Sequence, residues 1–170
     1  MSPLVRRSWS PLGHTPVIYQ RTRSHQKVTV IAALCVTPQR DRVHLYFRLH
    51  CNANINADRT VDFLTQLDRQ IAAPLVVVWD RLRAQRALKV KDFLTDHRRV
   101  RTVFLPPYAP ELNPIQYLWG YLKMNPLANR PRFDAQQLAD TTRCCARSVQ
   151  HQQKLLISFI QHSPLSLRVK

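Results

Sequence analysis

Asp80 and Gln116 are the two side chains of this sequence whose positions suggest chemistry. Asp80 directly follows the continuous apolar run at residues 75–79, and Gln116 follows a second apolar segment at residues 100–105 and a proline-rich turn. α/β proteins keep catalytic and binding groups at the carboxyl ends of their strands. Because the pattern between the two is strand, helix, strand, a right-handed crossover would bring both side chains to the same end of a sheet. Taken alone, Asp80 could also be a turn-forming aspartate after a strand.

A stiff turn precedes Gln116 and should fix the position of its side chain. Residues 105–114 read Leu-Pro-Pro-Tyr-Ala-Pro-Glu-Leu-Asn-Pro. Asn113 suits a helix N-cap and Pro114 the first helical position, which puts Gln116 at the third position of the helix. There its side-chain amide could reach back to the backbone N–H of Asn113 in a capping box. We therefore favour a structural role for Gln116.

The elements that position these residues are predicted from periodicity and turn signals. Residues 27–37 are rich in β-branched side chains, and residues 43–51 alternate between apolar and polar, which predicts a hairpin. Residues 56–72 predict a helix capped at Asn56 or Asp58. The apolar run before Asp80 is continuous, which predicts a strand covered on both faces. The remaining expected elements are a helix around residues 88–94, a strand at 100–105, a helix from Pro114 and a last helical region from about 133 to 161.

The charge of the chain indicates a polyanionic partner. The 170 residues carry 26 Lys and Arg against 10 Asp and Glu, a net charge of +16. A basic domain gains binding free energy when it neutralises phosphates, because counterions are released. The length fits one domain with a real core. We expect nucleic acid as the partner, and the alternatives are a merely soluble basic protein or a ribosome-associated one.

Many of the basic side chains cluster in the predicted helix after Asp80 and in the loop that leaves it. They are Arg81, Arg83, Arg86, Lys89, Lys91, Arg98, Arg99 and Arg101. Their position beside the end of the sheet that carries Asp80 favours contacts with phosphates, which would be independent of the DNA sequence. The alternative is a solvated helix face.

Several classes of protein are excluded by the sequence. No segment approaches the roughly 18 apolar residues of a membrane span, and the N-terminal residues have no apolar run typical of a secretory signal. The 2 glycines leave no glycine-rich phosphate loop, and the 4 cysteines lack the paired spacing of a zinc site. His50 and Cys51 would point to opposite faces of a strand. We expect a cytoplasmic protein with reduced thiols, associated with the nucleoid if it binds DNA.

Three stretches of the sequence resemble one protein family. They are residues 76–94, with Val-Val-Val-Trp-Asp followed later by Val-Lys-Asp-Phe-Leu; residues 105–114, with the proline-rich turn; and residues 7–17, with Arg-Ser-Trp-Ser-Pro-Leu-Gly-His-Thr-Pro-Val. Together they resemble DDE-type transposases of bacterial insertion sequences related to mariner elements, over about residues 5–130. The resemblance implies an α/β fold with a ribonuclease H-like mixed sheet flanked by helices. It also implies DNA strand cleavage and transfer in transposition.

The same resemblance implies a metal centre of three carboxylates, two Asp and one Glu, that binds Mg²⁺ or Mn²⁺. Hard divalent ions prefer oxygen ligands. In a two-ion site one ion activates the attacking oxygen and the other stabilises the leaving oxygen. By this comparison Asp80 is the second carboxylate and a metal ligand, and Gln116 stands at the Glu position.

The chain departs from the family pattern at this metal centre. The amide oxygen of Gln116 could still ligate Mg²⁺ but brings no charge, and Glu111, the only glutamate, lies before the helix. No aspartate occurs before Asp41, which falls in the hairpin turn, so the first carboxylate is missing. Arg81 adds a cation that opposes metal binding. Gln85 stands where relatives often have histidine.

The missing first aspartate also has a consequence for the fold. In ribonuclease H-like sheets the strand that carries it is central, and losing it would remove on the order of 5–10 kcal/mol of apolar burial. We expect the isolated chain to be marginally stable, to aggregate, or to borrow a strand from residues 15–20 or from another chain. We assign residues 1–130 to a truncated endonuclease domain and residues 131–170 to a C-terminal helical extension of it.

The sequence therefore predicts a degenerate transposase domain that is inactive as an isolated chain and binds DNA nonspecifically, with steep salt dependence. Two alternatives stay open. One is a noncatalytic nucleic-acid-binding remnant, or a subunit that modulates full-length transposase. The other is half of a split enzyme, completed by an upstream reading frame. Besides DNA, the partners that we consider are a second copy of the chain or full-length transposase.

Overall fold

The computed structural model describes residues 10–14, 27–125, 127–128, 135–165 and 169. Its strands are β1 (Val28–Val36), β2 (Val43–Cys51), β3 (Leu75–Trp79) and β4 (Val100–Phe104). Its α-helices are α1 (Ala57–Gln70), α2 (Leu88–Asp96), α3 (Ile115–Met124), α4 (Ala135–Gln150) and α5 (Gln153–His162). Two short 3₁₀ helices, η1 (Arg83–Arg86) and η2 (Pro110–Leu112), follow β3 and β4. The strands and helices that periodicity predicted are present in the predicted order.

β1 and β2 form the predicted hairpin, an antiparallel pair whose register joins Val36 to Val43 at the turn. The turn is held by Thr37, whose hydroxyl donates to Asp41 Oδ1 at 2.6 Å. This hydrogen bond holds the pKa of Asp41 below its ordinary value. Asp41 is therefore a turn residue, as the sequence predicted.

The four strands form two separate sheets of two strands each. β3 and β4 are parallel, joined by η1 and α2, with Leu75 paired to Val100 and Trp79 to Phe104. Within the described ranges, no strand joins this parallel pair to the β1–β2 hairpin. The segment that we considered as a replacement, residues 15–20, lies outside the described residues.

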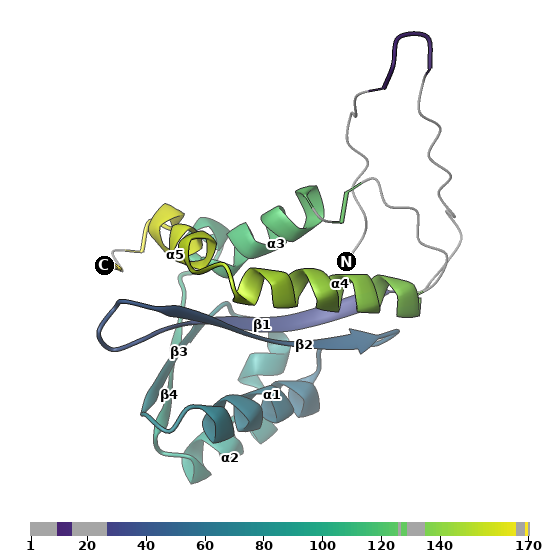
Figure 1. Cartoon of the computed structure of the whole chain (residues 1–170). Helices are drawn as coiled ribbons and strands as arrows, with labels where there is room; N and C mark the ends of the chain where they lie inside the picture. Colours follow the sequence, from purple (N-terminus) through teal and green to yellow (C-terminus); the bar gives the residue numbers. More distant parts are fainter. Residues whose placement is uncertain (1–9, 15–26, 126, 129–134, 166–168, 170) are drawn as a thin grey trace.

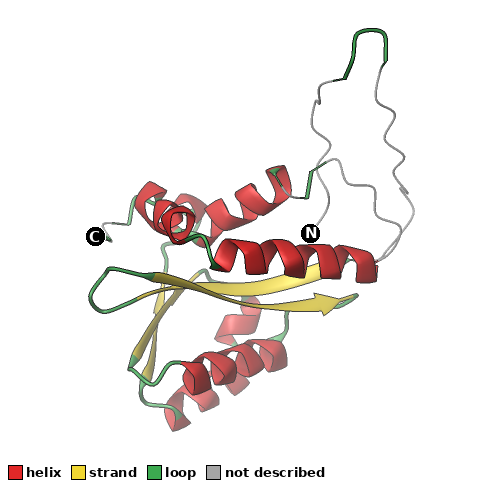
Figure 2. Cartoon of the chain, in the orientation of Figure 1, coloured by secondary structure: helices red, strands yellow, loops and turns green. Residues whose placement is uncertain are grey.

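The helices lie in two groups on opposite sides of the hairpin (Figures 1 and 2). Helices α3, α4 and α5 cover one face of β1 and β2, while α1 and α2 lie on the other side together with β3 and β4. The largest apolar cluster joins Val43 and Leu45 of β2 to Leu118 and Leu122 of α3 and Leu156 of α5. The C-terminal helices thus share a core with β2. The division of the chain at residue 130 stays a prediction.

Helix α1 begins at one of its two predicted caps, since Asn56 Oδ1 accepts a hydrogen bond from the Arg59 N–H at 3.0 Å. Its buried side chains Phe63 and Leu67 pack against β3 and β4, and Leu64 packs against α2. No helix in the described part of the chain is both long and apolar enough to cross a membrane.

Only one face of β3 is covered, so the prediction of a strand buried on both faces is wrong. Leu75 and Trp79 are buried under α1 and α2. On the opposite face Val76 is 66% exposed, Val78 45% and Val103 of β4 51%. The physical reason is the separation of the two sheets: α3, α4 and α5 cover the hairpin and not the β3–β4 pair.

The single helical region predicted from about 133 to 161 is two helices, with a break at residues 151–152. Neither glycine nor proline marks this break. Gln150, at the end of α4, donates through Nε2 to the carbonyl of Leu45 at 2.6 Å. Gln153, at the start of α5, donates to the carbonyl of Val43 at 2.8 Å. The turn between the helices lets both of them reach the edge of β2.

Candidate functional site

Asp80 lies where β3 ends, beside the segment that leaves β4. The Leu105 N–H donates to the carbonyl of Trp79 at 2.9 Å, which fixes the two strand ends together. Gln85 of η1 donates through Nε2 to Asp80 Oδ1 at 2.7 Å. The other end of the same amide, Gln85 Oε1, accepts from the Leu82 N–H at 3.2 Å. Asp80 is therefore held by a short loop that folds back onto it.

Gln85 is a site residue whose role sequence reasoning missed. The resemblance to the family indicated only that Gln85 replaces a histidine. The signal was its spacing: a five-residue step from a strand-end carboxylate to an amide, across a tight 3₁₀ turn, lets the side chain return to the strand end.

Arg81 does not act as a simple counter-charge to Asp80. Its Nε donates to the carbonyl of Leu105 at 3.2 Å, on the segment after β4. The side chain thus spans the ends of the two parallel strands, although the residue as a whole is exposed. A cation next to Asp80 in the chain still opposes the binding of a divalent ion there.

The capping box predicted for Gln116 is not formed. Asn113 Oδ1 accepts from the Ile115 N–H at 3.3 Å, so its side chain does satisfy a backbone donor at the start of α3. The backbone N–H of Asn113, however, donates to the carbonyl of Pro110 at 3.0 Å, because η2 precedes the helix. That bond removes the partner that the Gln116 amide would need. Pro114 has helical dihedrals, with φ at −56°.

Gln116 instead presents an exposed side chain near the start of α3. Its backbone N–H donates to the Asn113 carbonyl at 3.0 Å. Among the described residues, no hydrogen bond involves the Gln116 side chain, and none joins Gln116 to Asp80. Asp80 directly follows β3, whereas Gln116 lies in α3, after β4 and η2. That the two side chains act at one site stays a prediction.

The described residues do not fit a two-ion metal centre. In the ranges that the structure covers, no group of three or more His, Cys, Asp or Glu side chains is arranged to hold a metal ion. Asp80 is one carboxylate, and its Oδ1 is already bound by Gln85. Gln116 supplies an uncharged amide. Two divalent ions need several anionic oxygen ligands to offset the cost of dehydration.

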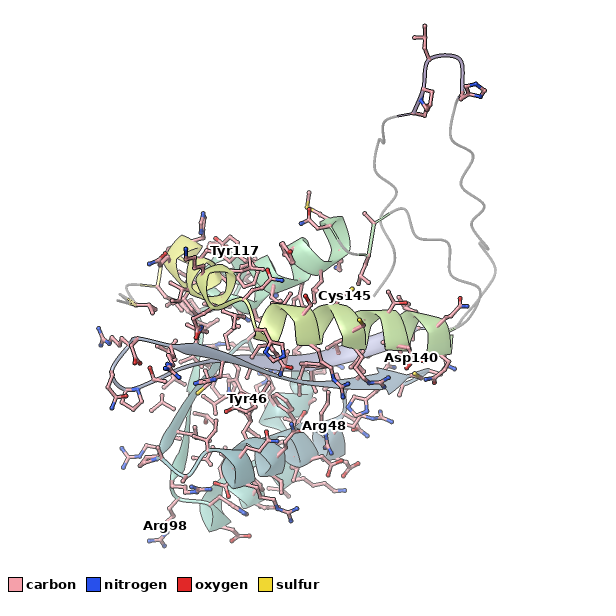
Figure 3. All side chains as sticks on the ribbon, viewed as in Figure 1. Tyr46, Arg48, Arg98, Tyr117, Asp140 and Cys145 are labelled. Atoms are coloured by element: carbon pink, nitrogen blue, oxygen red, sulfur yellow. The ribbon has the colours of Figure 1, made fainter. Side chains whose placement is uncertain are left out.

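The basic side chains after Asp80 divide between the two ends of the β3–β4 pair. Arg83 and Arg86 lie in η1, beside the Asp80 end, and both are exposed. Arg98 and Arg99 precede β4, so they lie at the opposite end of that strand, about 16 Å away for five residues of parallel strand. Arg98 projects from the end of the molecule farthest from α3 (Figure 3).

Two of these basic residues have acidic partners within the fold. Arg99 donates through Nε to Asp68 Oδ1 at 2.6 Å, and its other nitrogens bond the carbonyls of Asp68 and Ile71. Lys89 pairs with Asp58 at 2.6 Å on an exposed surface. The ammonium holds the pKa of Asp58 below its ordinary value, and the carboxylate raises the pKa of Lys89.

A family model described as DDE superfamily endonuclease matches residues 2–139 of the chain. The chain belongs to this family. A second match is to an uncharacterized protein, y4pE/y4sA, of Sinorhizobium fredii (strain NBRC 101917 / NGR234). It is 41% identical over 59 residues, which are 35% of this chain and 38% of that protein.

The fold of this DDE superfamily chain is similar to that of Mos1 mariner transposase. The structure of the Mos1 strand transfer complex has a TM-score of 0.65 and 19% identity, and covers 97% of this chain and 48% of the Mos1 chain. The Mos1 paired end complex with Mn gives a TM-score of 0.65 and 17% identity. The Mos1 catalytic domain with raltegravir and Mg gives 0.53 and 15%, over 79% of this chain and 75% of that one.

At these identities the similarity shows the fold, which is ribonuclease H-like as the sequence predicted. The chain spans about half the length of the Mos1 chains in the strand transfer and paired end complexes.

Proposed function

We propose that this DDE superfamily chain is a transposase-derived DNA-binding domain that does not complete a metal-dependent cleavage centre with its own residues. The proposal rests on two features of the candidate metal site. Asp80, its single strand-end carboxylate, is hydrogen-bonded to Gln85 at 2.7 Å. The side chain at the family's Glu position, Gln116, is an exposed amide.

Two observations support DNA binding: the net charge of the chain and the positions of its exposed basic residues. The net charge of the chain is +16. Arg81, Arg83 and Arg86 follow β3 directly and are exposed. Lys91, in α2, is also exposed. Such contacts are made to phosphates and not to bases, so binding should not depend on the sequence of the duplex. The logarithm of the binding constant should fall with the logarithm of the salt concentration, with a slope of about −0.9 per phosphate contact.

A second candidate is that another polypeptide completes the domain. Among the residues that the structure describes, the two sheets share no strand, and the face of β3 that carries Val76 and Val78 is exposed. A polypeptide that adds a strand at the free edge of β3 and packs a further element on this face would cover the apolar surface, and it could bring a carboxylate next to Asp80. In this alternative the chain acts as a subunit that joins or modulates a longer transposase. We place the protein in the cytoplasm, at the nucleoid, because its proposed ligand is DNA.

The test is cleavage of terminal-repeat DNA in Mg²⁺ or Mn²⁺ by the wild-type chain, Gln116→Glu and Asp80→Ala. We expect no cleavage by the wild type, with nonspecific binding intact. Arg83→Gln combined with Arg86→Gln should weaken that binding, whereas Arg98→Gln, at the opposite end of β4, is the matched control. Metal-dependent cutting by the wild type that Asp80→Ala abolishes would refute the inactive assignment. Preference for element ends over random duplex at equal salt would refute nonspecific binding.

A further inference from the structure

The outer edge of β2 is a strand edge without a neighbouring strand. In the described part of the chain β2 pairs only with β1. Hydrogen bonds from Thr37 N–H to the Arg42 carbonyl and from Asn52 N–H to the Lys27 carbonyl close the ladder at its two ends. Because an antiparallel ladder alternates, the odd-numbered residues of β2 direct their N–H and C=O groups away from β1.

Part of this edge is already satisfied by side chains. The carbonyls of Val43 and Leu45 accept from Gln153 and Gln150 at 2.8 and 2.6 Å. The next two outward positions are Phe47 and Leu49. Among the hydrogen bonds of the described residues, none reaches the outward backbone groups of either one. The edge is therefore closed at the turn end of β2 and open over its second half.

The open half of the edge forms the floor of a groove between α1 and α4. The groove has a volume of about 590 Å³. Phe47, Arg48, Leu49 and His50 line it from β2, with Asp62 and Gln66 from α1 and Arg143 and Arg147 from α4 among the other lining residues. Arg48 extends from β2 toward the α1 side (Figure 3). A strand laid on β2 would therefore have walls on both of its faces.

The lining of the groove has a net positive charge, with three arginines against one carboxylate. Arg48 lies on the α1 side, and Arg143 and Arg147 lie on the α4 side, against one lining carboxylate, Asp62. Asp140 pairs with Arg143 outside the lining. The Nε2 atom of His50 is buried and has no hydrogen-bond partner among the described residues. Cationic side chains on an edge strand also discourage pairing with a second copy of the same basic edge.

These features select one kind of occupant. An extended peptide offers alternating N–H and C=O groups, which match the alternating groups of Phe47 and Leu49. The phosphate backbone of a single nucleic-acid strand offers acceptors but no donors for the two carbonyls. The net positive charge of the groove lining favours acidic side chains on the bound peptide. This chain has 10 Asp and Glu against 26 Lys and Arg, so a second copy is a poor match.

We propose that the outer edge of β2 binds an extended acidic segment of another protein as an added third strand. Backbone hydrogen bonds to Phe47 and Leu49 would fix its register. Its carboxylates would alternate between Arg48 on one side and Arg143 and Arg147 on the other. This surface is distinct from the residues after β3 to which we assign DNA.

The test uses the full chain and a fluorescent peptide of 9 residues, the length of β2, in which pairs of glutamates alternate with pairs of valines, so that carboxylates fall on both faces of the added strand. Anisotropy measures its affinity. Three control ligands are compared: a lysine–valine peptide, the acidic peptide N-methylated at alternate residues, and a single-stranded oligonucleotide. N-methylation removes backbone donors but keeps the charge, so it separates strand addition from simple ionic attraction without relying on any variant of the protein.

We expect the acidic peptide to bind at least about tenfold more tightly than the lysine and N-methylated peptides, a difference of about 1.4 kcal/mol. Arg48→Gln with Arg147→Gln should weaken it by about tenfold, while Arg98→Gln should leave it unchanged. Equal binding of the N-methylated peptide would overturn the proposal. The proposal would also be overturned if the oligonucleotide bound more tightly than the acidic peptide and the Arg48 and Arg147 substitutions weakened that binding. The groove would then be a nucleic-acid site.

Discussion

Arg99→Ala should destabilise the fold while leaving DNA binding nearly unchanged. Arg99 precedes β4 and reaches the C-terminal end of α1. There its guanidinium pairs with Asp68 Oδ1 at 2.6 Å and donates to the carbonyls of Asp68 and Ile71. The last carbonyls of a helix have no partner within the helix. Arg99 thus acts as a cap that ties α1 to β4.

The magnitude follows from these contacts. The Arg99 side chain is 37% exposed and that of Asp68 15% exposed, so the ion pair is partly screened and we count it at less than about 1 kcal/mol. The two hydrogen bonds to carbonyls contribute roughly 0.5–1.5 kcal/mol each. The total loss is about 2 kcal/mol. For a chain of this size that corresponds to a fall in Tm of about 4–8 °C.

Thermal or urea unfolding measures the loss, and Arg98→Ala is the matched control. Arg98 is the preceding residue, carries the same charge and is exposed, so its removal should leave stability within about 0.5 kcal/mol. Arg99→Lys should recover only part of the loss, because an ammonium cannot reproduce the planar fork. Equal stability of the Arg99 and Arg98 variants would refute the capping role. A larger loss of DNA affinity in the Arg99 variant than in the Arg98 variant would restore its assignment as a phosphate contact.

Three further outcomes are expected. A thiol reagent should label Cys144, which is exposed, before Cys35, because burial raises the pKa of the Cys35 thiol; mass mapping of the labelled peptides checks the order. Burial, with the nearby Arg59 and Arg48, lowers the pKa of His50 below its ordinary 6.5. The folded state therefore binds a proton at His50 less readily than the unfolded state, so stability should be retained above pH 6.5 and lost as pH falls below it. His50→Asn should reduce this loss, which urea unfolding at a series of pH values measures. Replacing Val76 and Val78 with threonine should reduce self-association measured by light scattering, because both are exposed on β3.

The fold could be predicted from the sequence where periodicity has one interpretation. The alternation in residues 43–51 gives β2, and the turn chemistry of Asp41 marks the hairpin. Periodicity could not show that one face of β3 is exposed, because a continuous apolar run records a strand's preference for burial and not whether a helix covers it. The break between α4 and α5 was missed for a related reason: it is made by the tertiary contacts of Gln150 and Gln153 with β2.

The parallel pairing of the two strands on either side of the candidate site was predicted by the crossover rule. The contacts of Asp80 and Gln116 were not. The capping box failed because η2 inserts a turn that uses the Asn113 N–H, and a turn of three residues leaves little signal in a proline-rich segment. Which arginines contact phosphate could not be read from a run of basic residues either. Arg99 differs from Arg98 only in facing Asp68.

The hydrogen bond between Gln85 and Asp80 changes what the presence of Asp80 means. A strand-end carboxylate that holds η1 against β3 has a structural reason to be there, whether or not it binds metal. The two roles compete for the same oxygen, because Gln85 Nε2 donates to Oδ1, which a metal ion would also need. If Asp80 is only structural, Gln85→Ala should lower stability and leave Mn²⁺ affinity undetectable by calorimetry. If Asp80 retains a ligand role, removal of the amide should raise Mn²⁺ affinity despite the loss in stability, and Asp80→Asn, which keeps the shape of the side chain, should abolish that gain.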